Sequence, residues 1–119
     1  MHKNILVTGG SGMVGKYLKN ILPEATYMSS KDCDLRDSKQ VDDFWGEIKP
    51  DVVVHLGAKV GGILENLASP ADFYNENTLI NTNVLMMSKK HNVKRFTGIL
   101  STCMYPDVVE NYPMTEKDV

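Results

Sequence analysis

The sequence contains little cysteine. Only Cys33 and Cys103 occur among its 119 residues. Neither lies in a Cys-x-x-Cys pattern or beside a histidine at metal-ligand spacing, so we expect neither a disulfide framework nor a metal site. This cysteine usage favours a reducing compartment, and we expect a cytoplasmic location.

Runs of one charge and long hydrophobic stretches are also scarce. Lys and Arg number 13 against 15 Asp and Glu, for a net charge of -2, and no basic cluster stands out. We therefore expect no nucleic-acid partner. The apolar run that starts at Ile5 is too short for a signal peptide or a membrane span, so we expect no membrane association. The remaining composition, 42% hydrophobic and 24% charged, is typical of one globular domain.

Short apolar runs alternate along the chain with helical patterns. The apolar runs suit strands buried on both faces and span 5–7, 25–28, 51–56 and 95–100. The helical patterns span 12–22, 38–48 and 71–91. In the first of them, Val14, Leu18, Ile21 and Leu22 form the apolar face.

This alternation predicts an α/β fold with right-handed crossovers. We expect a partial Rossmann-type, doubly wound parallel sheet of about four strands in the order 3-2-1-4. One dinucleotide-binding domain would then account for residues 1–119.

A glycine-rich loop links the first expected strand to the first expected helix. Gly9 permits the tight turn, Gly12 lets a pyrophosphate approach the backbone, and Gly15 allows close helix packing. The predicted phosphate loop consists of Gly9, Gly10, Ser11, Gly12, Met13, Val14 and Gly15. The alternative is a glycine-rich turn that binds nothing. Because no Gly-Lys-Ser/Thr follows, a nucleotide-hydrolysing P-loop is not expected.

The end of the second expected strand bears on the choice of cofactor. NAD-preferring folds place a carboxylate there, whereas this chain has Ser29, Ser30 and Lys31. Two hydroxyls and a cation suit a 2′-phosphate, so NADP (NADPH) is the expected cofactor. The alternative is a polar turn without a ligand.

Four segments together resemble the extended short-chain dehydrogenase/reductase family. They are ILVTGGSGMVG at 5–15, SSKDCDL at 29–35, HLGAKVGGI at 55–63 and LSTCMYP at 100–106. The resemblance covers essentially the whole chain. The last two segments are similar to the branch that epimerises and reduces GDP-4-keto-6-deoxy-D-mannose to GDP-L-fucose.

The resemblance implies further cofactor contacts. Asp34 and Leu35 would contact the adenine, and the segment after the third strand would line the ribose and pyrophosphate. That segment comprises Leu56, Gly57, Ala58 and Lys59. A strand end that turns sharply is an alternative for its first three residues, and both interpretations can hold together. Asn83, inside the longest helix, is expected to tie that helix to a neighbouring loop.

The same resemblance assigns catalytic roles to Ser101 and Cys103. Ser101 would donate a hydrogen bond to the 4-keto oxygen during reduction. Cys103 would act as base or acid at the carbons beside that keto group, whose α-protons the ketone acidifies. Without the resemblance, a small buried hydrophobe is the commoner role for such a cysteine.

Members of the family also use a Tyr-x-x-x-Lys pair, with the tyrosine as proton donor. In this sequence the pattern occurs only at Tyr27 and Lys31, on the adenosine side, where we interpret it as chance. We therefore expect a catalytically incomplete N-terminal portion of an enzyme that binds a GDP-sugar. A homodimer is compatible with the family. The alternatives are another nucleotide-sugar epimerase or dehydratase that uses NAD, and a non-catalytic dinucleotide-binding module.

Overall fold

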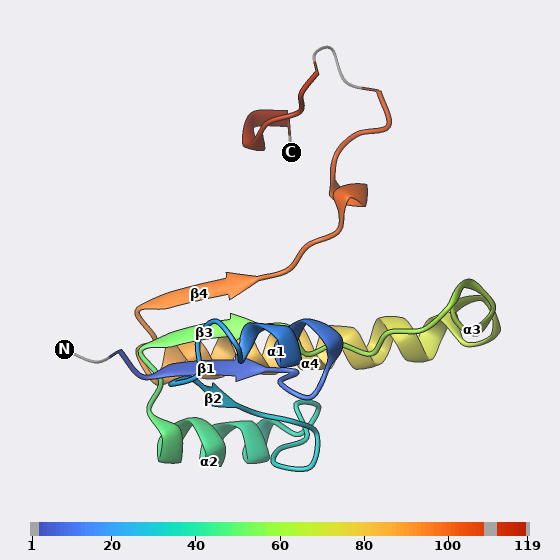
Figure 1. Ribbon diagram of the computed structural model, residues 1–119. Helices are drawn as coiled ribbons and strands as arrows, with labels where there is room; N and C mark the ends of the chain where they lie inside the picture. The colour runs from blue at the N-terminus through green and yellow to red at the C-terminus, as the bar shows by residue number, and fades with distance from the viewer. Residues whose placement is uncertain (1–2, 109–111, 119) are drawn as a thin grey trace.

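The fold is a four-stranded parallel sheet with helices on both faces (Figure 1). The structure, a computed structural model, describes residues 3–108 and 112–118. The strands are β1 (Ile5–Thr8), β2 (Thr26–Tyr27), β3 (Val52–His55) and β4 (Arg95–Gly98). The helices are α1 (Met13–Leu18), α2 (Ser38–Ile48), α3 (Ile63–Ala68) and α4 (Pro70–Lys90), and short 3-10 turns follow at Thr102–Met104 and Glu116–Asp118. The predicted α/β class is confirmed.

The order of the strands is β2-β1-β3-β4. The expected order 3-2-1-4 is therefore wrong in one respect, because the third strand lies beside β1 and not outside β2. Strand β2 pairs only Thr26 and Tyr27 with β1, so its outer edge offers little to a neighbour. All four residues of β1 pair with β3, which lies in the interior of the sheet between β1 and β4.

This order reverses the direction of winding between β1 and β3. In doubly wound sheets, ligands bind at the carboxyl ends of the strands where such a reversal occurs. Right-handed crossovers in opposite directions also place helices on opposite faces, with α1 on one and α2 and α4 on the other.

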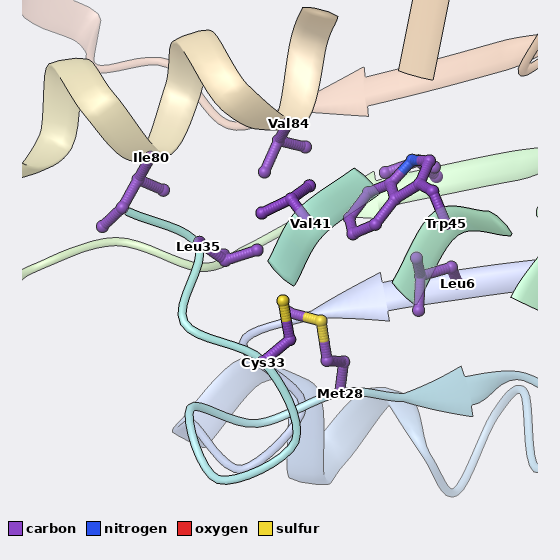
Figure 2. Packing of buried hydrophobic residues seen from close by; sticks show 9 residues of the cluster. Leu6, Met28, Cys33, Leu35, Val41, Trp45, Ile80 and Val84 are labelled. Atoms are coloured by element: carbon purple, nitrogen blue, oxygen red, sulfur yellow. The ribbon is translucent and has the colours of Figure 1, made fainter. Parts of the chain in front are cut away.

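The main core lies between the sheet and the pair α2 and α4. Figure 2 shows side chains of both helices converging above the strands. Trp45 of α2 is fully buried, and its indole N–H donates to Ser88 Oγ of α4 at 3.3 Å. Helix α2 begins where the Asp37 carboxylate accepts the N–H groups of Lys39 and Gln40. The cluster comprises Leu6, Met28, Cys33, Leu35, Val41, Trp45, Val53, Ile80 and Val84.

Helix α1 is shorter than the sequence indicated. It ends at Leu18, whereas a helix to residue 22 was expected, and of the predicted apolar face Val14 and Ile21 are 56% and 63% exposed. Leu18 and Leu22, the other two residues of this apolar face, are half-buried. The face is therefore only partly covered.

Two further features concern α4 and the segment that precedes it. The Asn83 amide donates to the Leu35 carbonyl at 2.9 Å, which confirms the predicted tie between the helix and a loop. Helix α3 was not expected from the sequence, and none of its residues is buried. No helix among residues 3–108 and 112–118 is long and apolar enough to cross a membrane.

Candidate functional site

The loops that follow β1 and β3 meet at the reversal point of the sheet. Gly9 adopts φ +67°, a conformation that L side chains rarely adopt. A Cβ on Gly9 would lie 2.8 Å from the Leu56 carbonyl carbon and 2.8 Å from the Gly57 nitrogen. Only glycine therefore allows the two loops to approach this closely.

The rest of the predicted phosphate loop folds over Gly9. The Gly12 N–H donates to the Gly9 carbonyl at 3.0 Å, and the Gly10 N–H donates to the Met28 carbonyl at 2.7 Å. A Cβ on Gly15 would lie 2.7 Å from the Gly9 carbonyl oxygen. Gly15 thus brings α1 close to its own loop, which refines its expected role in packing. Ser11, Gly12, Met13 and Val14 are exposed on the outer surface.

A polar network, which the sequence analysis missed, joins the ends of the two strands; its members Thr8 and His55 are buried and Asn81 is exposed. Thr8 Oγ1 lies 2.7 Å from His55 Nδ1, and His55 Nε2 lies 3.0 Å from Asn81 Oδ1 of α4. The Thr8 oxygen also accepts the N–H groups of Leu56 and Gly57, at 3.2 and 3.1 Å. Burial lowers the pKa of His55. A threonine before Gly-Gly and a histidine inside an apolar strand were the available signals in the sequence.

The loop after β3 is fastened to α4. The Lys59 N–H donates to Asn77 Oδ1 at 2.8 Å, and the Asn77 amide donates back to the Lys59 carbonyl at 3.0 Å. The Lys59 ammonium pairs with Glu76 at 2.6 Å, and this bond lowers the pKa of the Glu76 carboxyl. Ala58, which sequence analysis also assigned to the cofactor, is exposed.

The two residues predicted to contact adenine lie in the loop before α2. Asp34 forms an ion pair with Arg36 at 2.8 Å, and hydrogen bonds from Arg36 lower the pKa of the Asp34 carboxyl. Arg36 also pairs with Glu76 at 2.9 Å, so one carboxylate of α4 holds both loops. Leu35 packs into the core, and a Cβ on Gly57 would lie 2.8 Å from Leu35 Cδ1, so its side chain also reaches the loop after β3.

The predicted 2′-phosphate pocket forms a tight polar turn. The Ser29 N–H and hydroxyl both donate to Asp32 Oδ2 at 2.7 Å, and these bonds lower the pKa of the Asp32 carboxyl. Ser30 and Lys31 are exposed. Because Ser29 is engaged with Asp32, Ser30 and Lys31 are the available groups of the pocket.

Ser101 and Cys103 lie beyond β4, at the carboxyl edge of the sheet. The Cys103 N–H donates to Ser101 Oγ at 3.1 Å, which leaves the serine O–H to donate elsewhere. Both side chains are exposed. Ser101 lines an open hollow of about 680 Å³ with residues of α4 and of the loop after β3, among them Lys59, Tyr74, Thr78 and Asn81.

Three further observations concern side chains outside this hollow. Tyr27 lies in β2, at the opposite edge of the sheet from β4, and its hydroxyl donates to the Leu22 carbonyl. Its Tyr-x-x-x-Lys pattern is therefore remote from Ser101. Burial raises the pKa of the Cys33 thiol to about 11, so this second cysteine is a protonated part of the core. Across the part of the chain that the structure describes, no three His, Cys, Asp or Glu side chains gather as a metal site.

Known proteins share both sequence and fold with the chain. The GDP-L-fucose synthase of Dictyostelium discoideum is 40% identical over 121 residues, which cover 96% of this chain and 38% of that protein. The probable GDP-L-fucose synthase of Drosophila melanogaster is 37% identical, with coverage of 96% and 37%. The chain thus spans little more than a third of the length of these relatives.

Solved structures agree with these relatives. A GDP-L-fucose synthetase from Naegleria fowleri bound to NADP superposes with a TM-score of 0.82 at 36% identity, covering 98% of this chain and 39% of that one. MlghC, a GDP-mannoheptose C4 reductase from Campylobacter jejuni with NADP bound, gives a TM-score of 0.84 at 30% identity, with coverage of 99% and 37%. Residues 5–119 match the NAD dependent epimerase/dehydratase family. The chain therefore belongs to the NAD dependent epimerase/dehydratase family.

Proposed function

We propose that the chain is the dinucleotide-binding part of an NADP-dependent epimerase-reductase that acts on a GDP-4-keto-6-deoxy sugar and forms GDP-L-fucose. The observation that carries the proposal is the close approach of the Gly9 loop to the Leu56–Gly57 backbone at the reversal point of the sheet. The exposed loop at 11–14 leaves room for a pyrophosphate beside that junction. The similarity to GDP-L-fucose synthases supports the substrate class.

The residues present fit the cofactor. The loop at 9–15 would hold the pyrophosphate, Asp34 and Leu35 the adenine, and Ser30 with Lys31 the 2′-phosphate. Backbone N–H groups and one cation are the donors that such an anion requires. When bound, the nicotinamide would supply the hydride that reduces the 4-keto carbon.

The chain itself supplies two groups for the chemistry beside that carbon. Ser101 would donate its O–H to the keto oxygen, which stabilises negative charge there during proton removal and during reduction. Cys103 would act on one face of the neighbouring carbon, either as the thiolate that removes its proton or as the thiol that returns one. Both side chains are exposed, and Ser101 lines the hollow, which supports these roles.

A titration with NADPH and NADH tests the cofactor directly. We expect NADPH to bind more tightly than NADH when nicotinamide fluorescence or calorimetric heat is followed. Equal affinity for both would remove the 2′-phosphate pocket from the proposal. Absence of binding by a chain shown to be folded by circular dichroism would overturn it.

Replacement of Lys31 by alanine is expected to weaken NADPH binding by about ten- to a hundredfold and leave NADH affinity unchanged. A charge-assisted contact to phosphate contributes roughly 1.5–3 kcal/mol, and each 1.4 kcal/mol is tenfold in affinity. The matched control is Lys39→Ala, because Lys39 is an exposed cation on α2 that pairs with Asp43. An equal loss in the control would show a general effect of charge.

The 119 residues by themselves are expected to give no steady oxidation of NADPH with GDP-4-keto-6-deoxy-D-mannose. The proton donor of a Tyr-x-x-x-Lys pair is required beside the keto oxygen, and Tyr27 lies at the opposite sheet edge. Absorbance at the nicotinamide band provides the measurement. Steady consumption that depends on Ser101 would contradict this expectation.

A reductase without epimerase activity is the second candidate, because the C4 reductase from C. jejuni has the same fold at 30% identity. Cys103 distinguishes the two. An epimerase exchanges deuterium from solvent into the carbons beside the keto group through this thiol. A C4 reductase does not need that exchange.

A further inference from the structure

Three polar side chains connect elements that are far apart in the sequence. Thr8 ends β1, His55 ends β3, and Asn81 projects from α4. Thr8 is fully buried and His55 is 8% exposed, whereas Asn81 lines the hollow next to Ser101. These contacts lead from Asn81, at the hollow, to the place where the loops after β1 and β3 meet.

Counting protons fixes the direction of each hydrogen bond. The Asn81 Oδ1 atom is an acceptor, so His55 carries its proton on Nε2 and its Nδ1 is an acceptor. The Thr8 hydroxyl must then donate to Nδ1. Both lone pairs of the Thr8 oxygen remain for two donors, which are the N–H groups of Leu56 and Gly57. Every group of the network is satisfied in this one arrangement.

We infer that Asn81 and His55 are positioning residues that orient the Thr8 hydroxyl and thereby hold the loop after β3 against the loop after β1. This positioning role rests on the proposed dinucleotide site. Asn81 and His55 would act there only through the Thr8 hydroxyl. Neither residue has to touch the cofactor.

The network tolerates only a neutral imidazole. If His55 gained a proton on Nδ1, both ring nitrogens would donate, and the Thr8 oxygen would accept from Nδ1. One lone pair would then remain for the two backbone N–H groups, so one of them would lose its partner. The loop after β3 would be released from the junction at its first or second residue.

The surroundings of His55 keep it neutral. Thr8 on β1, Asn81 on α4 and the Phe96 ring of β4, whose centroid lies 6.1 Å away, carry no charge. The charged residue of β4, Arg95, lies opposite Val52 at the far end of the strand. The ammonium of Lys59 and the carboxylate of Glu76 pair with each other. Burial is the main cause that lowers the pKa of His55.

The Asn81→Asp variant tests the inference by changing which proton state is favoured. A carboxylate that accepts from Nε2 favours the charged imidazole, so His55 should titrate between about pH 6 and 8. We expect the backbone amide NMR signals of Leu56 and Gly57 to follow that titration in the variant and to stay constant in the wild type. The double variant Asn81→Asp with His55→Gln should lose the titration.

Thr82→Asp is the matched control, since Thr82 is exposed on the same helix one residue away. It adds the same charge without facing the imidazole, and its Leu56 and Gly57 signals should stay constant with pH. Amide signals that ignore pH in Asn81→Asp while its His55 titrates would overturn the inference.

Cofactor affinity provides the functional readout. Between about pH 8 and 6, NADPH affinity of Asn81→Asp should fall by about three- to tenfold, the loss expected for one hydrogen bond, while the wild type and Thr82→Asp change little. Affinity of Asn81→Asp that does not depend on pH would refute the positioning role alone. A wild type that binds neither NADPH nor NADH would refute the proposed function, and the positioning role with it.

Discussion

The Gly9→Ala variant is expected to lose on the order of 3 kcal/mol of unfolding free energy. An L side chain in the left-handed region costs roughly 1–2 kcal/mol by itself. The new Cβ would also lie 2.8 Å from backbone atoms of Leu56 and Gly57, and backbone cannot move aside as a flexible side chain can. Because small domains are stabilised by roughly 5–15 kcal/mol, this loss is large. Urea unfolding followed by far-UV circular dichroism measures it.

The Gly62→Ala variant is the matched control. A Cβ on Gly62 would meet no atom within 4 Å, and the residue has φ -70°, which suits alanine. Its unfolding free energy should lie within about 0.5 kcal/mol of the wild type, as is usual for surface substitutions. NADPH binding should separate the two variants in the same way. A Gly9→Ala protein as stable as Gly62→Ala would show that the loops do not meet at Gly9.

Replacement of Trp45 by alanine is expected to lower the unfolding free energy by about 3–5 kcal/mol, the range for large aromatic side chains in cores. Trp45 is fully buried at the centre of the cluster that joins α2, α4 and the sheet. Its loss leaves a cavity between the helices and removes the hydrogen bond to Ser88. Because Trp45 is the only tryptophan, unfolding should be followed by circular dichroism and not by fluorescence.

Two milder variants separate packing from the hydrogen bond. Trp45→Phe keeps most of the aromatic volume and should lose less than Trp45→Ala. Ser88→Ala leaves the buried indole N–H without its acceptor, and should cost roughly 1–3 kcal/mol. If Trp45→Ala lost no more than Trp45→Phe, the cluster would not depend on this side chain for its packing.

The proposed NADP site and the Thr8–His55–Asn81 network both involve the place where the loops after β1 and β3 meet. The glycine-rich loop was visible in the sequence because the glycine spacing and the preceding apolar strand are local features. The Thr8–His55–Asn81 network was not, because its members are separated by 47 and 26 residues. The sequence analysis also did not predict the ion pairs of Glu76 with Arg36 and Lys59, for the same reason.

Helix boundaries show the limit of periodicity. The pattern at 12–22 indicated an apolar face, yet α1 ends at Leu18 and Val14 is more than half exposed. Periodicity reports which side of a helix can be buried, whereas burial requires a second surface. For α2, that surface is α4, and Val41 and Trp45 are accordingly buried.

By itself, the sequence determined the α/β class and the position of the glycine-rich loop, since each depends on neighbours within a few positions. The residues proposed for the adenine and the keto carbon came from the resemblance to a family and stay a proposal. Only the tertiary structure decided the order β2-β1-β3-β4 and the junction built around Thr8. The physical reason is that strand order depends on how many residues of one strand can pair with a strand far away in the sequence. Strand β1 pairs two residues with β2 and four with β3, and these pairs form only when the strands lie side by side.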